Sequence, residues 1–213
     1  MSLWDDAETD SATLSSATVS TEFPISRFHP IVDLAAGYEV LDFSQGASAK
    51  RFTDSPRTVG RYDEDRAIYT TPLFAGGRRI HMGIDLGAAV GTPVHVFAPG
   101  RLFCQGMNPS AGDYGPTIIT HHVVDGLELW VLHGHLSLKS LDLRTPGTQI
   151  AAGEVLGWIG DEEVNGGWPP HVHIQLSREE PRTHDMPGAV SLEEREAARA
   201  RYPDPRLILG PLY

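Results

Sequence analysis

Histidines at a repeated spacing are the residues in this sequence that could do chemistry. The chain has 10 histidines, and two pairs are separated by a single residue, namely His133 with His135 and His171 with His173. In a β-strand, side chains at i and i+2 point to the same side, about 6.6 Å apart along the strand. A strand interpretation therefore places both imidazoles of each pair on one face, where they could serve one centre.

A third motif combines an imidazole with a carboxylate. His81 and Asp85 are four residues apart, and the glycines at 83 and 87 let the backbone fold closely around a centre. Catalytic zinc takes three protein ligands from histidine and carboxylate and keeps the fourth position for water, whose pKa falls to about 7. His81, Asp85 and one histidine of a pair supply that set. The remaining histidines could accept a proton from the attacking water or donate hydrogen bonds to an oxyanion, so the motifs indicate a hydrolase site.

Each motif taken alone is more often structural than functional. A single histidine on a strand usually packs in the core or lies at the surface, and an isolated pair binds metal in roughly one case in five. Three motifs in one β-rich chain would require that coincidence three times, which favours a metal site. The adjacent His121 and His122 point to opposite faces of a strand and are interpreted as structural, as are His29, His95 and His184.

The elements that must position these residues are short β-strands. After Arg79, β-type runs alternate with glycine and proline, which is typical of an all-β domain. The runs are 94–97, 102–104, 117–124, 127–136, 155–159 and 171–176. Asp125-Gly126 lies between two of them and predicts a hairpin. One helix is expected over about 191–201, because Ser191 and Glu194 form a capping box and prolines follow its end.

Composition limits the classes of partner. The apolar fraction of 40% and the charged fraction of 21% are near globular averages. Lysine and arginine number 17 against 28 acidic residues, so the net charge is −11, which repels phosphates and predicts no nucleic-acid partner. No run approaches the ~20 apolar residues of a membrane helix, and no membrane insertion is expected. The lone Cys104 and the lack of a signal peptide favour the cytoplasm, with an exported form as the alternative.

Two segments precede the motifs. Residues 1–22 are acidic and rich in serine and threonine, and this composition predicts a disordered tail. Residues 23–78 are mixed, and their pattern predicts no topology. We expect residues 23–213 to form a single domain whose core motifs lie at 79–177.

In order and spacing, the motifs resemble the lysostaphin-type (LytM-like) zinc metallopeptidase family. The matching stretches are His81-Met82-Gly83-Ile84-Asp85-Leu86, Gly91-Thr92-Pro93-Val94, Ala98-Pro99-Gly100, His133-Gly134-His135-Leu136 and His171-Val172-His173-Ile174-Gln175. The resemblance implies a mainly β fold, an antiparallel sheet or sandwich of the duplicated-hybrid-motif kind with a short C-terminal helix. It also implies one Zn²⁺ per chain held by His81, Asp85 and His173, with His135 and His171 as general base and oxyanion stabiliser.

Several departures from the family pattern are present, and none removes a metal ligand. His133 takes the usual tyrosine position, Gln175 replaces a glutamate, and Trp168-Pro169-Pro170 replaces Thr-Gly-Pro. We expect His133 and Trp168 to contact substrate, although Trp168 could instead fix the loop that aims His171.

The family resemblance also implies a reaction. Family members usually cut peptide bonds in bacterial cell walls, often next to glycine, so we expect a zinc-dependent metalloendopeptidase with a peptide or peptidoglycan-like substrate. The alternatives are a non-catalytic zinc-containing binding or scaffold module of the same fold, and a zinc amidase that acts on a small cytoplasmic substrate.

Three further stretches carry a more particular likeness. Residues 62–69, 165–171 and 202–210 resemble the peptidase-like middle segment of large bacterial fusion proteins. Those proteins have a kinase-like phosphotransferase domain before this segment and a class III aminotransferase domain after it. This likeness implies a cytoplasmic enzyme rather than a wall hydrolase.

Overall fold

Short runs bounded by glycine and proline form strands along most of the chain. The structure is a computed structural model that describes residues 27–44 and 57–213, so the tail predicted for residues 1–22 lies outside the described residues. The strands are β1 (Glu39–Val40), β2 (Thr58–Gly60), β3 (Glu64–Asp65), β4 (Ile80–His81), β5 (Ile84–Gly87), β6 (Pro93–His95), β7 (Gly100–Asn108), β8 (Gly115–Val124), β9 (Leu127–Gly134), β10 (Gln149–Ile150), β11 (Val155–Trp158), β12 (His171–Ser177) and β13 (Ala189–Val190). The helices are α1 (Arg195–Arg201) and α2 (Arg206–Leu209), and the 3-10 turns are η3 (Pro72–Phe74) and η4 (Leu138–Ser140).

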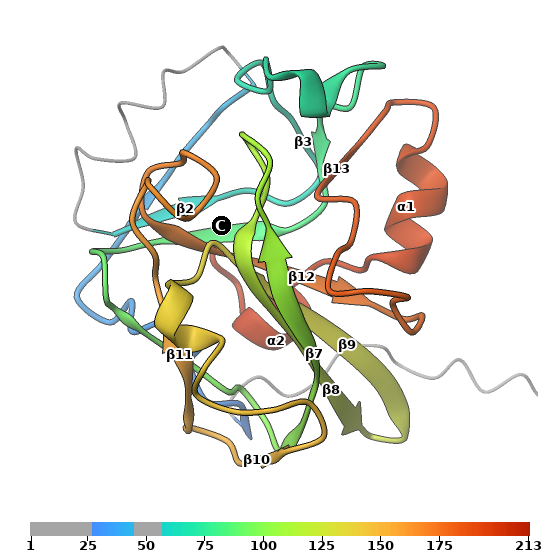
Figure 1. The fold of residues 1–213 in the computed structure, drawn as a ribbon. Coiled ribbons are helices and arrows are strands. Elements are labelled where there is room, and N and C mark those ends of the chain that lie inside the picture. Colours follow the sequence, from blue (N-terminus) through green and yellow to red (C-terminus); the bar gives the residue numbers. More distant parts are fainter. Residues whose placement is uncertain (1–26, 45–56) are drawn as a thin grey trace, which may run out of the picture.

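The strands form one large sheet and two small ones (Figure 1). The large sheet has eight strands in the order β1-β2-β5-β12-β9-β8-β7-β10. All of its neighbouring strands pair antiparallel except β1 and β2, which are parallel. β6 pairs with β11, and β4 lies between β3 and β13. The predicted fold class, mainly β and antiparallel with a short C-terminal helix, is confirmed.

Both faces of the large sheet are covered. One face, here called the core face, belongs to a buried cluster that includes Ile84, Ile118, Val131 and Ile174 together with side chains of β6 and β11. The opposite face, here called the site face, carries Leu132 in a second cluster that reaches α1. Because side chains alternate along a strand, residues next to core-face residues belong to the site face.

The predicted hairpin and helix are both present. Asp125 and Gly126 join β8 to β9 with φ values of 51° and 79°, and positive φ at both central residues is the pattern of a type I′ turn. In the capping box, the Ser191 N–H donates to Glu194 Oε2 at 3.0 Å, and the Glu194 N–H donates to Ser191 Oγ at 3.3 Å. Residues 192–194 form a turn, so α1 begins only at Arg195. The helix is therefore shorter than the predicted 191–201.

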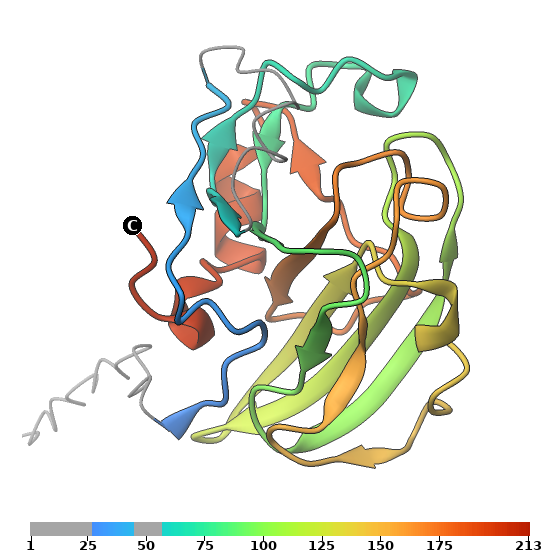
Figure 2. The ribbon, with the colours of Figure 1, turned by 90° about the vertical axis from the view of Figure 1, so that its left-hand side faces the viewer.

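The segment before residue 79, for which the sequence predicts no topology, adds strands beside the motifs. β2 pairs with β5, which sets Gly60 opposite Asp85, and β3 pairs with β4, which sets Glu64 opposite His81. The segment that includes β1 runs beside the C-terminal segment (Figure 2), where the Tyr38 hydroxyl donates to the backbone of Leu212 at 3.0 Å. No helix of the described residues is long and apolar enough to cross a membrane.

Candidate metal centre

Strand pairing brings the first motif, His81 and Asp85, next to His173 of the last one. In the antiparallel pair β5–β12, His173 is directly opposite Asp85, and opposite residues share a face of the sheet. His81 ends β4, and the chain reaches β5 through Met82 and Gly83. A Cβ at Gly83 would lie only 2.4 Å from His173 Cε1, so a glycine is needed where the backbone passes over that ring. Residues 92 positions apart in the chain are thereby in contact.

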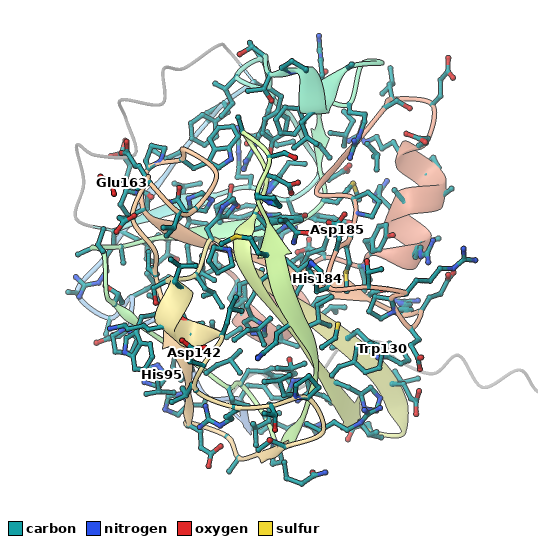
Figure 3. The ribbon with its side chains drawn as sticks, in the orientation of Figure 1. His95, Trp130, Asp142, Glu163, His184 and Asp185 are labelled. Carbon is teal, nitrogen blue, oxygen red and sulfur yellow. The ribbon has the colours of Figure 1, made fainter. Side chains whose placement is uncertain are left out.

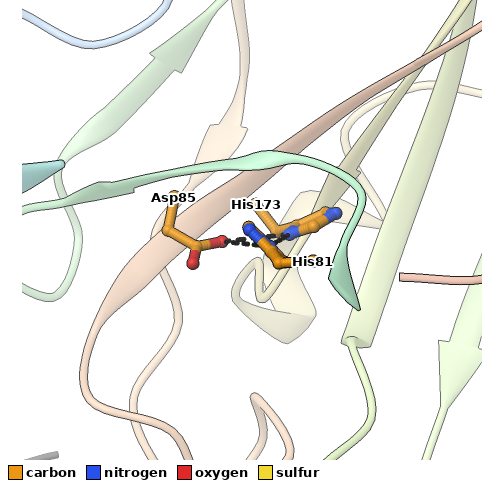
Figure 4. Close-up of side chains that lie close together, drawn as sticks. All are labelled: His81, Asp85 and His173. Atoms are coloured by element: carbon orange, nitrogen blue, oxygen red, sulfur yellow. Dashed lines mark hydrogen bonds and ion pairs between the residues drawn. The ribbon is translucent and has the colours of Figure 1, made fainter. Parts of the chain in front are cut away.

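The side chains of His81, Asp85 and His173 converge on one point (Figure 4). His81 Nε2 lies 3.0 Å from His173 Nδ1, and Asp85 Oδ1 lies 3.0 Å from His173 Nδ1 and 3.3 Å from His81 Nε2. All three residues are buried. Ligand atoms about 2.0–2.1 Å from a tetrahedral zinc ion are separated by about 3.3 Å, so these spacings fit a zinc ion.

In the His81 and His173 rings, the nitrogen that points away from Asp85 makes a hydrogen bond that identifies the other nitrogen as an acceptor. His81 Nδ1 donates to the carbonyl oxygen of Arg61 at 2.8 Å, and His173 Nε2 donates to Gln175 Oε1 at 3.1 Å, since both of those oxygens can only accept. In the neutral imidazoles, the inner nitrogens then carry lone pairs. Two lone pairs and a carboxylate oxygen converge without a donor between them, and a cation satisfies that arrangement.

Charges around the centre keep Asp85 ionised and His81 neutral. Burial alone would raise the pKa of Asp85, but the charge of His81, which is protonated only in the acidic range where Asp85 titrates, and the charge of Arg66 outweigh burial and hold that pKa well below its usual range. Burial, together with the Arg66 charge, lowers the pKa of His81 to about 4. An ionised carboxylate and a neutral imidazole are the forms that bind a metal ion.

The two predicted catalytic histidines lie beside this triad. The His171 and His135 rings are 4.3 Å apart between centroids, and His171 Nε2 lies 3.7 Å from Asp85 Oδ1. Each ring donates from Nδ1 to a backbone carbonyl at 2.7 Å, His171 to Pro169 and His135 to Asn165. Burial lowers the pKa of both side chains. Both are therefore neutral near pH 7 with the Nε2 lone pair available to accept a proton.

The structure contradicts the expectation that His133 contacts substrate. His133 is 1% exposed and pairs with Ile118 on one side and Ile174 on the other, so it lies on the core face. His135 reaches the site face because β9 ends at Gly134 and His135 has a φ of 61°. The strand alternation that was expected to place His133 and His135 together stops between them.

A cavity of about 190 Å³ lies over the triad and includes Trp168 in its lining. The Trp168 ring contacts Tyr69 and Phe74 edge-on, with centroids 6.0 and 6.3 Å away, and those two rings stack at 4.2 Å. Asn165 also fixes the Trp168 backbone, since Asn165 Nδ2 donates to its carbonyl at 2.8 Å and the Trp168 N–H donates to Asn165 Oδ1 at 3.0 Å. Trp168 thus has both of the placements that the sequence left open, in the cavity wall and in the loop before His171.

Several residues of the site carried no signal of a role there in the sequence. Arg66 and Tyr69 lie within residues 62–69, whose likeness to a segment of fusion proteins indicated no site residue, and Phe74 follows in the same segment. Tyr114 lies with its hydroxyl 3.2 Å from Gln175 Oε1 and 3.1 Å from the carbonyl oxygen of Met186. Asp185, labelled in Figure 3, lies in the segment between β12 and β13 and also lines the cavity.

The region that contains the site is similar in sequence to known proteins. Residues 79–185 match peptidase family M23. The chain is 35% identical over 97 residues to the DD-carboxypeptidase/endopeptidase Mpg of Neisseria meningitidis serogroup B, which is 46% of this chain and 20% of Mpg. It is 26% identical over 122 residues to lysostaphin of Staphylococcus staphylolyticus, which is 57% of this chain and 23% of lysostaphin. The chain thus covers less than a quarter of either relative.

Solved structures with a similar chain path include two catalytic domains. A mutant catalytic domain of the prophage-encoded M23 protein EnpA from Enterococcus faecalis is 24% identical, with 65% of this chain and 89% of that chain covered and a TM-score of 0.45. The catalytic domain of lysostaphin from Staphylococcus simulans is 19% identical, with 71% and 98% covered and a TM-score of 0.41.

Proposed function

The chain belongs to peptidase family M23, a family of metallopeptidases, and on that basis we propose that it is a zinc-dependent endopeptidase. The observation that carries the zinc dependence is the convergence of three acceptor atoms, from His81, Asp85 and His173, at spacings that fit a tetrahedral ion. A bound zinc ion would supply Lewis-acid activation of water and of the scissile carbonyl.

His171 and His135 manage the proton in this proposal. Their Nδ1 protons are committed to the carbonyls of Pro169 and Asn165, so Nε2 is the atom that accepts a proton from the attacking water. One of the two histidines acts as this base. The other, whose ring lies 4.3 Å away, would take up a proton from solvent on Nε2 and, as an imidazolium, donate it in a hydrogen bond to the developing oxyanion.

The cavity supports a peptide substrate rather than a small amide. Tyr69, Phe74 and Trp168 form an apolar wall of contacting rings beside the triad, against which the backbone or side chains of a peptide can pack. Because its relatives include a DD-carboxypeptidase/endopeptidase and lysostaphin, we propose cell-wall-type or glycine-containing peptides as the substrate class. Trp168 acts in substrate binding, and we expect Trp168→Ala to raise KM about tenfold while the zinc content stays unchanged.

Hydrolysis of defined substrates tests the proposal. Zinc-loaded protein is incubated with pentaglycine, with cross-linked peptidoglycan fragments and with small amides, before and after zinc is removed by a chelator. We expect cleavage of a peptide substrate that is lost with the zinc and returns when zinc is added back. Turnover of none of them would favour the binding-module alternative, and preference for small amides would favour the amidase.

A further inference from the structure

We propose that Arg66, held by Glu64, is a positioning residue that fixes the Asp85 carboxylate so that a single oxygen, Oδ1, is presented to the metal. The inference rests on the proposed zinc site, and it assigns a role in that site to the segment before residue 79, outside the stretch that matches the family.

The two oxygens of Asp85 have different partners. Oδ2 accepts a hydrogen bond from Arg66 Nη1 at 2.7 Å, and both side chains are almost fully buried. Oδ1 faces His173 Nδ1 at 3.0 Å and His81 Nε2 at 3.3 Å. A carboxylate anchored through one oxygen cannot rotate to offer both oxygens to an ion. The Arg66 contact therefore favours one-oxygen ligation and the four-coordinate geometry that suits zinc.

The guanidinium of Arg66 is itself held on several sides. Arg66 Nε donates to Glu64 Oε2 at 3.0 Å, and Nη1 also lies 3.1 Å from the Tyr69 hydroxyl. Glu64 Oε1 in turn accepts from the backbone N–H of Phe43 at 3.0 Å and from Arg61 Nη2 at 2.8 Å. The charge of Arg66 is thus balanced by two buried carboxylates, and its fork has one orientation toward Asp85.

The backbone opposite Asp85 leaves room for this contact. Gly60 pairs with Asp85 across β2 and β5, and a Cβ at Gly60 would lie 2.8 Å from both Arg66 Nη2 and Asp85 Oδ2. Any side chain at this position would push the guanidinium and the carboxylate apart.

Zinc affinity and cobalt spectra of matched variants test this role. Arg66→Met removes the contact to Asp85. Glu64→Gln keeps the size of the side chain that holds Arg66 but removes its charge. The control is Arg79→Met, which breaks an exposed Arg79–Asp65 ion pair of 2.6 Å between the ends of the same two strands, β3 and β4, and leaves the Arg66–Asp85 contact in place. The zinc Kd is measured by competition with a chromophoric chelator. Co²⁺-substituted protein gives a visible absorption band whose intensity reports the coordination number. Circular dichroism confirms that each variant is folded at the assay temperature.

We expect Arg66→Met to weaken zinc binding by about 10- to 100-fold and to reduce the Co²⁺ band, as a four-coordinate site gives way to a higher coordination number. Glu64→Gln should change both readouts in the same direction but less, and Arg79→Met should match the wild type. If Arg66→Met does not fold, Glu64→Gln decides the question.

Two results would overturn the role of Arg66. One is a wild-type zinc Kd and Co²⁺ spectrum in both Arg66→Met and Glu64→Gln. The other is faster hydrolysis at unchanged zinc affinity, which would mean that Arg66 obstructs the site. If the wild type itself binds no zinc, the proposed function fails, and this outcome is distinct from either of the others.

Discussion

Two histidine pairs with identical spacing in the sequence are placed differently relative to the faces of the large sheet. On β12, His171 and His173 both lie on the site face, because the strand continues through Ser177 and alternation is preserved. On β9, His133 lies on the core face whereas His135 lies at the cavity, because the strand ends at Gly134 and His135 adopts a φ of 61°. An i, i+2 spacing therefore predicts a shared face only while the strand lasts.

Burial does not distinguish His135, the proposed proton acceptor, from His133. It lowers the pKa of His133 to about 3 and also holds the pKa of His135 well below its usual range. The difference lies in their neighbours. His135 contacts the ring of His171, whereas His133 Nε2 has no hydrogen-bond partner among the described residues. A lowered histidine pKa therefore shows only that the ring is buried. The proposed role of His135 rests on the position of its ring beside His171.

The largest difference between the pairs concerns a proposed ligand. We expect His173→Gln to abolish hydrolysis, because losing the metal removes several kcal/mol of transition-state stabilisation, or about 1,000-fold or more in rate. The measurement is kcat/KM on the best peptide substrate, with His133→Gln as the control at wild-type activity. Comparable losses in the two variants would contradict the distinction between the faces.

The second comparison is between His133, on β9, and His135, just after its end. His135→Gln removes a proposed proton acceptor but no ligand, so kcat should fall by about 10²- to 10⁴-fold while zinc binding is retained. His133→Gln should leave kcat within about twofold of the wild type. The pH–rate profile and zinc content of each variant are measured together. A large loss of kcat in a folded His133→Gln protein would contradict this account, because it would show that His133 acts in the active site.

His133 and His122 should make the free energy of unfolding depend on pH, because both are buried in the neutral form. Burial lowers the pKa of His122 to about 4 and that of His133 to about 3, from 6.5 in the unfolded chain. The unfolded state therefore binds more protons than the folded state below pH 6.5, and stability falls as the pH decreases toward 3.

Replacing His133 should remove its share of this slope. For metal-free His133→Leu, the free energy of unfolding should change less steeply between pH 6 and 4, by up to about 1.4 kcal/mol per pH unit. Urea unfolding at several pH values measures it. Parallel curves for variant and wild type would show that His133 titrates normally in the folded protein.

The smallest expected effect is that of His133→Leu at neutral pH. A leucine of similar size replaces an imidazole whose Nε2 lacks a partner and whose Nδ1 lies 3.4 Å from the carbonyl oxygen of Ile118. The free energy of unfolding should therefore change by no more than about 1 kcal/mol. Urea unfolding at pH 7.5 provides the value. A loss several times larger would assign His133 a structural contact beyond those described.

Local patterns in the sequence predicted what depends on neighbours along the chain. The Asp125-Gly126 hairpin needs only turn residues between two β runs. The grouping of His81 and Asp85 with a histidine of one of the two pairs needs only strands whose faces are set by alternation, and the choice of His173 came from the family resemblance. The Ser191–Glu194 capping box was likewise readable, although the first turn after it is not helical and α1 starts at Arg195.

What the sequence could not predict depends on distant contacts. Arg66 reaches Asp85 only because β2 pairs with β5 in one sheet and β3 pairs with β4 in another, and no periodicity in residues 23–78 encodes that placement. Tyr69 and Phe74 belong to the same segment. The four-residue helix α2 is too short to give a periodic signal between its flanking proline and glycine. Position 133 was misassigned because the end of β9 is set by the tertiary contact of the His135 backbone with Tyr114.

The zinc content of three purified proteins tests the central claim most directly. Wild type, His173→Gln and His133→Gln are loaded with zinc, dialysed and analysed by mass spectrometry of the metal. The account predicts about one zinc ion per chain in the wild type and in His133→Gln, and almost none in His173→Gln. Retention of zinc by His173→Gln, or its loss from His133→Gln in a folded protein, would contradict the assignment of the metal to the site face.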